Sequence, residues 1–256
     1  MPFVISNLAI FAAVFTLFKK EIRTFLSSLI GYIAICVFLL LVGLFLWILP
    51  TDSNILANGY AGLDSLFSLA PWVFLFLIPA ITMRSFADEK KAGTIEFLLT
   101  KPLTDLQIIL AKYFAGVTLV LFSLLPTLIY YYSVYKLGNP AGNIDSGGTW
   151  GSYIGLFFLA AAFTAIGIFA SSLSDNQIIA FILAVFLCFF CYIGFQYISM
   201  LDIFGKVDDF ILSIGINDHY LSMSRGVIDT RDIIYYLSVI GIFILFTKTS
   251  LESRKW

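Results

Sequence analysis

The sequence contains 256 residues, of which 60% are hydrophobic and 12% are charged, and that charged share is about half that of an ordinary soluble domain. A chain this apolar cannot cover a surface that faces water, which excludes a soluble globular domain and a disordered chain. The net charge of −1, from 15 basic and 16 acidic side chains, gives no indication of a nucleic acid partner. Long continuous apolar runs, in place of alternating ones, exclude a β-barrel and predict an all-α polytopic membrane protein.

Before the first predicted span, the chain divides into two parts. Residues 15–29 predict an amphipathic helix at the membrane interface, because apolar residues recur there at helical spacing. Its charged side chains lie between them: Lys19, Lys20, Glu21 and Arg23. Residues 1–13 form an apolar extension without the basic start of a signal peptide. This extension would be part of a seventh span, a helix on the membrane surface or the product of an upstream start codon.

Six apolar stretches without charged side chains are long enough, or nearly so, to cross a bilayer, which takes about 20 residues. They are residues 29–49, 66–83, 113–135, 150–173, 178–201 and 233–247. Because the last stretch is short, we expect Asp232 and Lys248 to reach from its ends toward the membrane surface. The long loop 202–232 carries apolar residues at helical spacing, which predicts short helices.

The basic residues predict the orientation of the six spans. If residues 19–23 are cytoplasmic, 11 of the 15 lysines and arginines fall on the cytoplasmic side. The other four fall on the outer side: Lys136, Lys206, Arg225 and Arg231. Since cytoplasmic loops carry the excess of lysine and arginine, we expect both termini to be cytoplasmic.

The most informative polar segment is 84–112, between the second and third spans. Residues 88–99 are compatible with a helix that has one apolar face, and Pro102 would end it. Thr104 and Gln107 have the spacing of a capping box that opens the next helix. The segment thus predicts a compact helix–break–helix, which is either a solvated loop or a docking element for a soluble partner.

The motif Glu-Lys-Lys-x-Gly-Thr-x-Glu-x-Leu-Leu at 89–99, followed by Pro-Leu-Thr at 102–104, resembles the signature of type-2 ABC exporter permeases. The runs at 70–86 and 224–232 are similar to the GldF family, the gliding-motility-associated permease subunits of Bacteroidetes. The resemblance covers the chain from about residue 14, so we treat residues 14–256 as one permease domain. It implies a cytoplasmic element that couples the permease to an ATPase. The implied coupling residues are Glu89, Gly93, Thr94, Glu96, Leu99 and Pro102.

The sequence lacks the motifs of an enzyme. There is no P-loop, and His219 is the only histidine; a lone loop histidine is more typical of a structural or solvated position than of catalysis. Cys188 and Cys191 have redox or metal spacing, but in an apolar run cysteine is usually an ordinary small side chain. We therefore predict no catalytic, cofactor-binding or metal-binding residue, and expect a partner subunit to bind and hydrolyse ATP.

The family resemblance implies the permease subunit of an ATP-driven exporter of the bacterial inner membrane, linked to gliding motility or secretion. The implied partners are a cytoplasmic ATPase, a second permease subunit, identical or different, and membrane lipid. The alternative is a scaffold of a motility or secretion complex without transport activity. A channel or an ion-coupled carrier is disfavoured, since these need ionisable side chains inside the membrane. The transported substrate is not indicated.

Overall fold

The computed structural model describes residues 2–95, 103–201 and 205–253. Within these ranges all regular structure is helical. Six helical segments are long and apolar enough to cross a membrane: Gly31–Ile48, Asp64–Lys91, Asp105–Leu137, Ser146–Leu173, Gln177–Ser199 and Thr230–Glu252. The chain is therefore an all-α polytopic membrane protein, which confirms the fold class predicted from composition.

The helices follow one another along the described chain with short connections. In order, they are α1 (Pro2–Leu26), α2 (Leu29–Gly43), a π-helix (Leu44–Ile48), α3 (Ile55–Asn58), α4 (Asp64–Thr82), α5 (Arg84–Lys91), α7 (Asp105–Leu124), a 3-10 helix (Leu125–Thr127), α8 (Leu128–Leu137), α9 (Ser146–Leu173), α10 (Gln177–Phe189), a π-helix (Phe190–Gly194), α11 (Phe195–Ser199), a 3-10 helix (Gly205–Val207), α12 (Asp208–Ile214), α13 (Ile216–Met223) and α14 (Thr230–Glu252).

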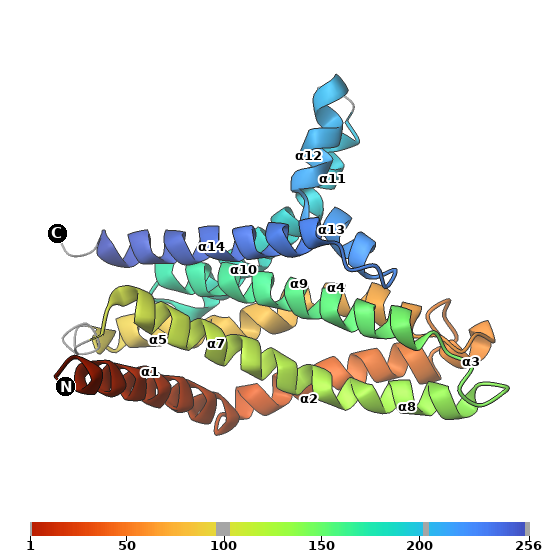
Figure 1. The fold of residues 1–256 in the computed structure, drawn as a ribbon, viewed down its shortest axis with the longest axis horizontal. Helices are drawn as coiled ribbons and strands as arrows, with labels where there is room; N and C mark the ends of the chain where they lie inside the picture. The colour runs from red at the N-terminus through yellow and green to blue at the C-terminus, as the bar shows by residue number, and fades with distance from the viewer. Residues whose placement is uncertain (1, 96–102, 202–204, 254–256) are drawn as a thin grey trace.

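The first two helices differ from the predicted boundaries. The expected helix over 15–29 is part of the longer helix α1, which ends at Leu26, and Leu29 already belongs to α2. Ser28 causes the break, because its backbone is extended and its side chain accepts a hydrogen bond from the amide of Gly31, as an N-cap residue does. Helix α1 lies beside the first half of α7 (Figure 1).

Helix α9 is the central element of the bundle and packs against α4, α7, α10 and α14. It is rich in Gly, Ala, Ser and Thr, which allow helix backbones to approach closely inside a membrane. Gly167 is such a position, since a Cβ atom there would collide with the side chain of Thr82 on α4. The bundle core is thus built around a helix of small residues.

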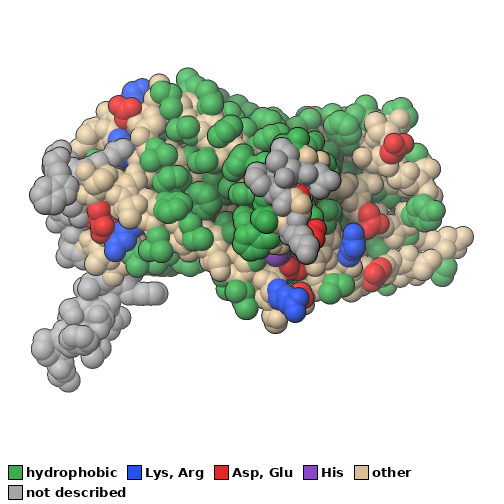
Figure 2. All heavy atoms as spheres, turned by 90° about the horizontal axis from the view of Figure 1, so that it is seen from above, with side chains coloured by type: hydrophobic (Ala, Val, Ile, Leu, Met, Phe, Trp, Pro, Cys, Tyr) green, Lys and Arg blue, Asp and Glu red, His purple; other side chains and the backbone are tan. Residues whose placement is uncertain are grey.

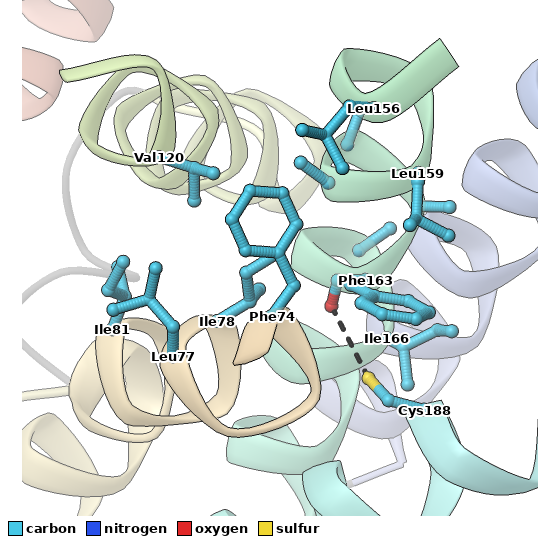
Figure 3. Close-up of a cluster of buried hydrophobic side chains, with 14 of the residues drawn as sticks. Phe74, Leu77, Ile78, Ile81, Val120, Leu156, Leu159, Phe163, Ile166 and Cys188 are labelled. Atoms are coloured by element: carbon cyan, nitrogen blue, oxygen red, sulfur yellow. Dashed lines mark hydrogen bonds between the residues drawn. The ribbon is translucent and has the colours of Figure 1, made fainter. Parts of the chain in front are cut away.

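Larger side chains fill the space where α4, α7, α9 and α10 meet (Figure 3). Phe74 on α4 and Phe163 on α9 are fully buried, and Val120 of α7 closes the cluster from a third side. The thiol of Cys188 lies 3.9 Å from the carbonyl oxygen of Phe163. In this position Cys188 packs as a small apolar side chain.

The outer surface separates apolar and charged side chains. Figure 2 shows a band of hydrophobic side chains across the middle of one face, with charged side chains toward its two ends. Helices α2, α10 and α14 have most of their apolar residues exposed or half-buried, with few fully buried. Such a band is what contact with lipid requires. One end holds α5 and the start of α7, and we call it the α5 end; the opposite end, with α3 and α13, is the α13 end.

Helices α11 and α12 form an arm that projects from the side of the bundle (Figure 1). The π-helix Phe190–Gly194 lies where α10 leads into the arm, and π-helical turns are common sites of bending. Helices α12 and α13 confirm the short helices predicted for the 202–232 loop in its described part. Asp232, expected to reach toward the membrane surface, is instead buried against His219.

Candidate functional site

The predicted segment 88–99 is not one helix. Helix α5 begins at Arg84, nearly continuous with α4, and ends at Lys91. Gly93 then has a φ of 66°, in the left-handed region that ends helices and that favours glycine. Apart from its two chain neighbours, no described residue has an atom within 4 Å of a Cβ atom built on Gly93. Among the described residues, glycine is therefore needed there for its backbone conformation and not for close packing.

The six predicted coupling residues divide between described and undescribed parts of the chain. Glu89 lies on α5 and is half-buried, whereas Gly93 and Thr94 are exposed in the turn that follows. The remaining three lie outside the described residues: Glu96, Leu99 and Pro102. The capping box predicted for the next helix is present, since Thr104 and Gln107 exchange hydrogen bonds at the start of α7.

Glu89 belongs to a four-residue ion network that joins α1, α5 and α7. The ammonium of Lys112 on α7 lies 3.0 Å from a carboxylate oxygen of Glu21 and 3.1 Å from Oε2 of Glu89. Lys20 lies 2.9 Å from the other oxygen of Glu89 and 3.4 Å from Glu21. Two lysines and two carboxylates from three separate helices thus meet at one point.

Lys112 is the buried centre of this network. Its side chain is 1% exposed. Its ammonium also donates to the carbonyl oxygen of Ser85, at 2.7 Å, and lies 5.1 Å from the centre of the Phe86 ring. A charge buried to this degree is tolerated only when it is paired and hydrogen-bonded. The network therefore fixes the start of α7 against α5.

Lys20 is the exposed edge of the network, with its side chain 54% exposed. Partial burial, the largest single effect, lowers the pKa of Lys20, but the hydrogen bond to Glu89 and the charges of Glu21 and Glu89 together raise the pKa above its usual 10.5. Lys20 therefore keeps its positive charge at neutral pH. Of the other charged residues predicted for this helix, Lys19 lies over the ring of Phe15, and the described residues show no ion pair for Arg23.

A second set of contacts fixes α5 to the turn between α9 and α10. The hydroxyl of Ser171 donates to the carbonyl oxygen of Met83 and accepts from the amides of Phe86 and Ala87, at 2.9, 3.0 and 3.2 Å. These amides belong to the first turn of α5, where helix amides have no partner within the helix. Ser171 thus caps α5 from a different helix.

Gln177, at the start of α10, extends this contact. Its side-chain oxygen accepts from Arg84, at 3.2 Å, and its amide nitrogen donates to Asp88. Lys90 donates to the carbonyl oxygen of Ser172, which also accepts from Ser250 near the end of α14. Helix α5 is therefore held by α9 and α10 as well as by the ion network, and Ser250 of α14 meets the same carbonyl oxygen as Lys90. A displacement of α5 would therefore change its contacts with several other helices of the bundle.

Sequence reasoning did not find Lys112, Ser171 or Gln177 as partners of α5. Glu21 and Lys112 are 91 residues apart, and such long-range contacts leave no trace in local spacing. The available signal was the position of Lys112, directly before an apolar stretch. A lysine directly before an apolar stretch either extends its ammonium back to water or pairs with a buried carboxylate.

The α13 end holds a different titratable pair. The ring nitrogens of His219 lie 2.7 Å from a carboxylate oxygen of Asp232 and 2.9 Å from the carbonyl oxygen of Ser213. The ring also stacks on Tyr235, with 3.7 Å between ring centres. These contacts tie α12, α13 and α14 together, which supports the structural interpretation of this histidine.

Comparison with known proteins gives the family. A protein-family model described as an ABC-2 family transporter protein matches residues 15–247, which includes five candidate spans in full and most of the sixth, Thr230–Glu252. The search among curated proteins found no match. Members of this family are the transmembrane components of ABC transporters and are not themselves the ATPase. The chain belongs to the ABC-2 transporter family, as a multi-pass permease subunit that associates with an ABC ATPase.

Proposed function

We propose that this permease subunit works in an ATP-driven exporter of the bacterial inner membrane, linked to gliding motility or secretion. A separate cytoplasmic ATPase would bind and hydrolyse ATP, and a second permease subunit, identical or different, would complete the membrane part. The resemblance of residues 70–86 and 224–232 to gliding-motility permeases supports this physiological role. The cargo itself is not specified by these residues.

The observation that carries the proposal is the attachment of α5 to the rest of the bundle. Glu89, a predicted coupling residue, sits in the four-residue ion network, and the exposed turn at Gly93 follows on the same segment. A cavity of about 140 Å³ lies beside the network, between α1, α4 and α7. A push from an ATPase on the turn would therefore reach α1, α7 and α9 through direct contacts. The free space beside the network lets these helices shift.

The test of coupling compares two substitutions at Gly93. Asparagine tolerates a left-handed backbone better than other residues, whereas tryptophan adds a bulky side chain to the exposed surface. We expect Gly93→Trp to lower co-purification of the ATPase and its stimulated ATP turnover about tenfold, if the lost contact is worth ~1.4 kcal/mol, while Gly93→Asn retains both. Membrane abundance of both variants is measured first. Unchanged binding and turnover with tryptophan would contradict the coupling role.

Charge reversal at Glu96 gives a second arm of this test, because the family resemblance implies a basic groove on the ATPase. In Glu96→Lys like charges would face each other, and we expect the same loss of co-purification as for Gly93→Trp. The scaffold alternative makes a different prediction. In a scaffold, ATP turnover by the partner would not respond to any cargo, even though the subunits still co-purify.

The α5 end is proposed to face the cytoplasm, on the basis of the eleven-to-four distribution of basic residues. Thr94 and Asp218 are both exposed and lie at opposite ends. In a background without the native cysteines, we expect a membrane-impermeant maleimide to label Asp218→Cys on whole cells, and Thr94→Cys only after permeabilisation. A separate variant that keeps Cys36 alone, on the exposed apolar face of α2, is the control and should stay unlabelled in lipid. Labelling of Thr94→Cys on whole cells would reverse the orientation.

A further inference from the structure

Two cavities adjoin each other at the α13 end. The first, of about 530 Å³, lies between α4, α11 and α13, and the second, of about 410 Å³, lies between the start of α4 and the start of α9. They share four lining residues: Asp64, Phe67, Ser224 and Arg225. Each volume falls in the range of about 300–1,000 Å³ that is typical of small-molecule sites.

The first cavity is aromatic. Trp72, Tyr192 and Tyr197 line it together with Met200. Tyr192 is buried and meets Trp72 edge to face, with 6.0 Å between ring centres. Trp72, Tyr197 and Met200 are exposed at the mouth, between 47% and 65%. An acyl chain lying against these side chains would cover apolar surface that is otherwise open.

The second cavity is polar, and its arginine stands on a rigid turn. Ser152 of α9 donates to the carbonyl oxygen of Ser224, at 2.8 Å. A Cβ atom on Gly151 would come within 2.7 Å of Gly226, so the turn that contains Arg225 packs directly on α9. A side chain held in this way loses less freedom when it binds a ligand.

The charged residues of the second cavity do not neutralise one another. Arg225, Asp64 and Asp145 line it, yet the described residues show no ion pair between this guanidinium and either carboxylate. One oxygen of Asp145 accepts from the amide of Gly148, at 2.9 Å, which leaves its other oxygen available. Opposite charges around one cavity, without mutual contact, suit a ligand that carries both signs.

We infer that the two cavities together bind a zwitterionic phospholipid. Its phosphate lies against Arg225, whose planar guanidinium suits phosphate oxygens. Its ammonium lies near Asp64 and Asp145, and one acyl chain follows the aromatic cavity past Trp72. This inference goes beyond the proposed transport function and does not depend on the ATPase.

The experiment uses the full chain, purified in detergent and examined by native mass spectrometry with added lipids. Phosphatidylethanolamine should be retained about tenfold more than phosphatidylglycerol, which lacks the ammonium, and than diacylglycerol, which lacks both charges. Glycerophosphoethanolamine, the headgroup without acyl chains, should not be retained, which separates a lipid from a free zwitterion. Equal retention of the three lipids would overturn the inference.

Substitutions then assign the headgroup contacts. Arg225→Gln should abolish the preference for phosphatidylethanolamine over diacylglycerol, and Asp64→Asn should reduce the preference over phosphatidylglycerol. Trp72→Ala should reduce the retention of all three lipids to the same extent. Arg231→Gln and Asp218→Asn are matched controls, because both residues are exposed at the same end and line neither cavity. An effect of Arg231→Gln as large as that of Arg225→Gln would overturn the site. If Arg225→Gln does not fold, the inference is tested by the order in which the wild-type protein retains the three lipids and by the effect of Asp64→Asn on that order.

Discussion

Replacing Gly167 by leucine is expected to prevent α4 and α9 from packing and to remove most of the folded protein from the membrane. A Cβ atom at Gly167 would already overlap the Thr82 side chain, whose hydroxyl donates to the carbonyl oxygen of Ile78 at 2.9 Å. Close by, a Cβ atom on Gly116 of α7 would come within 2.8 Å of Thr164, so neither neighbouring helix can yield easily. Overpacking of a tight core costs about 1–3 kcal/mol and occasionally more, and a leucine side chain that meets a clash already at its Cβ atom is expected at the upper end.

The measurement for this variant is membrane abundance together with the thermal unfolding temperature in detergent. Gly241→Leu is the matched control, because Gly241 is also helical but a Cβ atom there meets no other described helix within 4 Å. We expect Gly241→Leu to behave like the wild type. Equal abundance and equal unfolding temperatures of the two variants would show that α4 and α9 are not held by this close approach.

The second large effect is expected from Lys112→Met, which removes the buried centre of the four-residue ion network. Methionine fills a similar volume but leaves the carboxylates of Glu21 and Glu89 without their main partner. Among the described residues, Oε2 of Glu89 has only the ammonium of Lys112, at 3.1 Å, as a partner. Breaking a buried pair by removing one partner costs about 3–5 kcal/mol, so we expect a large drop in the unfolding temperature.

Lys248→Met provides the comparison for this prediction, because Lys248 pairs with Glu252 at 3.6 Å and both side chains are at least 40% exposed. Surface pairs of this kind are worth about 0–1 kcal/mol. The double variant Lys112→Met with Glu89→Gln should recover part of the lost stability, since it removes one of the unpaired carboxylates. If Lys112→Met destabilises no more than Lys248→Met, the network does not hold α5 in place.

The membrane-spanning helices could be predicted because their signal is local. Each span is a continuous apolar run whose length the bilayer dictates, and the cap of α7 depends on two residues only three positions apart, Thr104 and Gln107. The structure extends four of the six predicted runs, the second, third, fourth and last, whereas the first and fifth end slightly inside the predicted bounds. The fifteen residues predicted for the last span are part of α14, which reaches from Thr230 to Glu252. Hydropathy alone ends a helix at its first charge, whereas the backbone continues beyond it.

What could not be predicted depends on partners that are distant in the sequence. From the sequence alone, Asp232 is expected to be a solvated charge. In the structure, α13 and α14 place His219 beside it. From the sequence alone, Lys112 is expected to be a loop lysine. In the structure, α1 places a carboxylate oxygen of Glu21 3.0 Å from the ammonium of Lys112. Gly93 is a different case, because residues 88–99 have the pattern of a helix and only the backbone shows the left-handed turn. The environment of Asp232 and Lys112 depends on charge pairing, and that of Gly93 depends on backbone conformation. Neither property produces a periodic pattern in the sequence, so it could not be predicted from residue spacing.

The arm of α11 and α12 gives the protein a part that can vary independently. Its two helices pack mainly on each other and project from the bundle (Figure 1). A change in the length of α11 or α12 therefore leaves the packing of α9 against α4 and α14 untouched. Segments with few contacts to a core tolerate changes in length far better than the core itself. A related chain can thus acquire a different outer surface while it keeps the same bundle and the same attachment of α5.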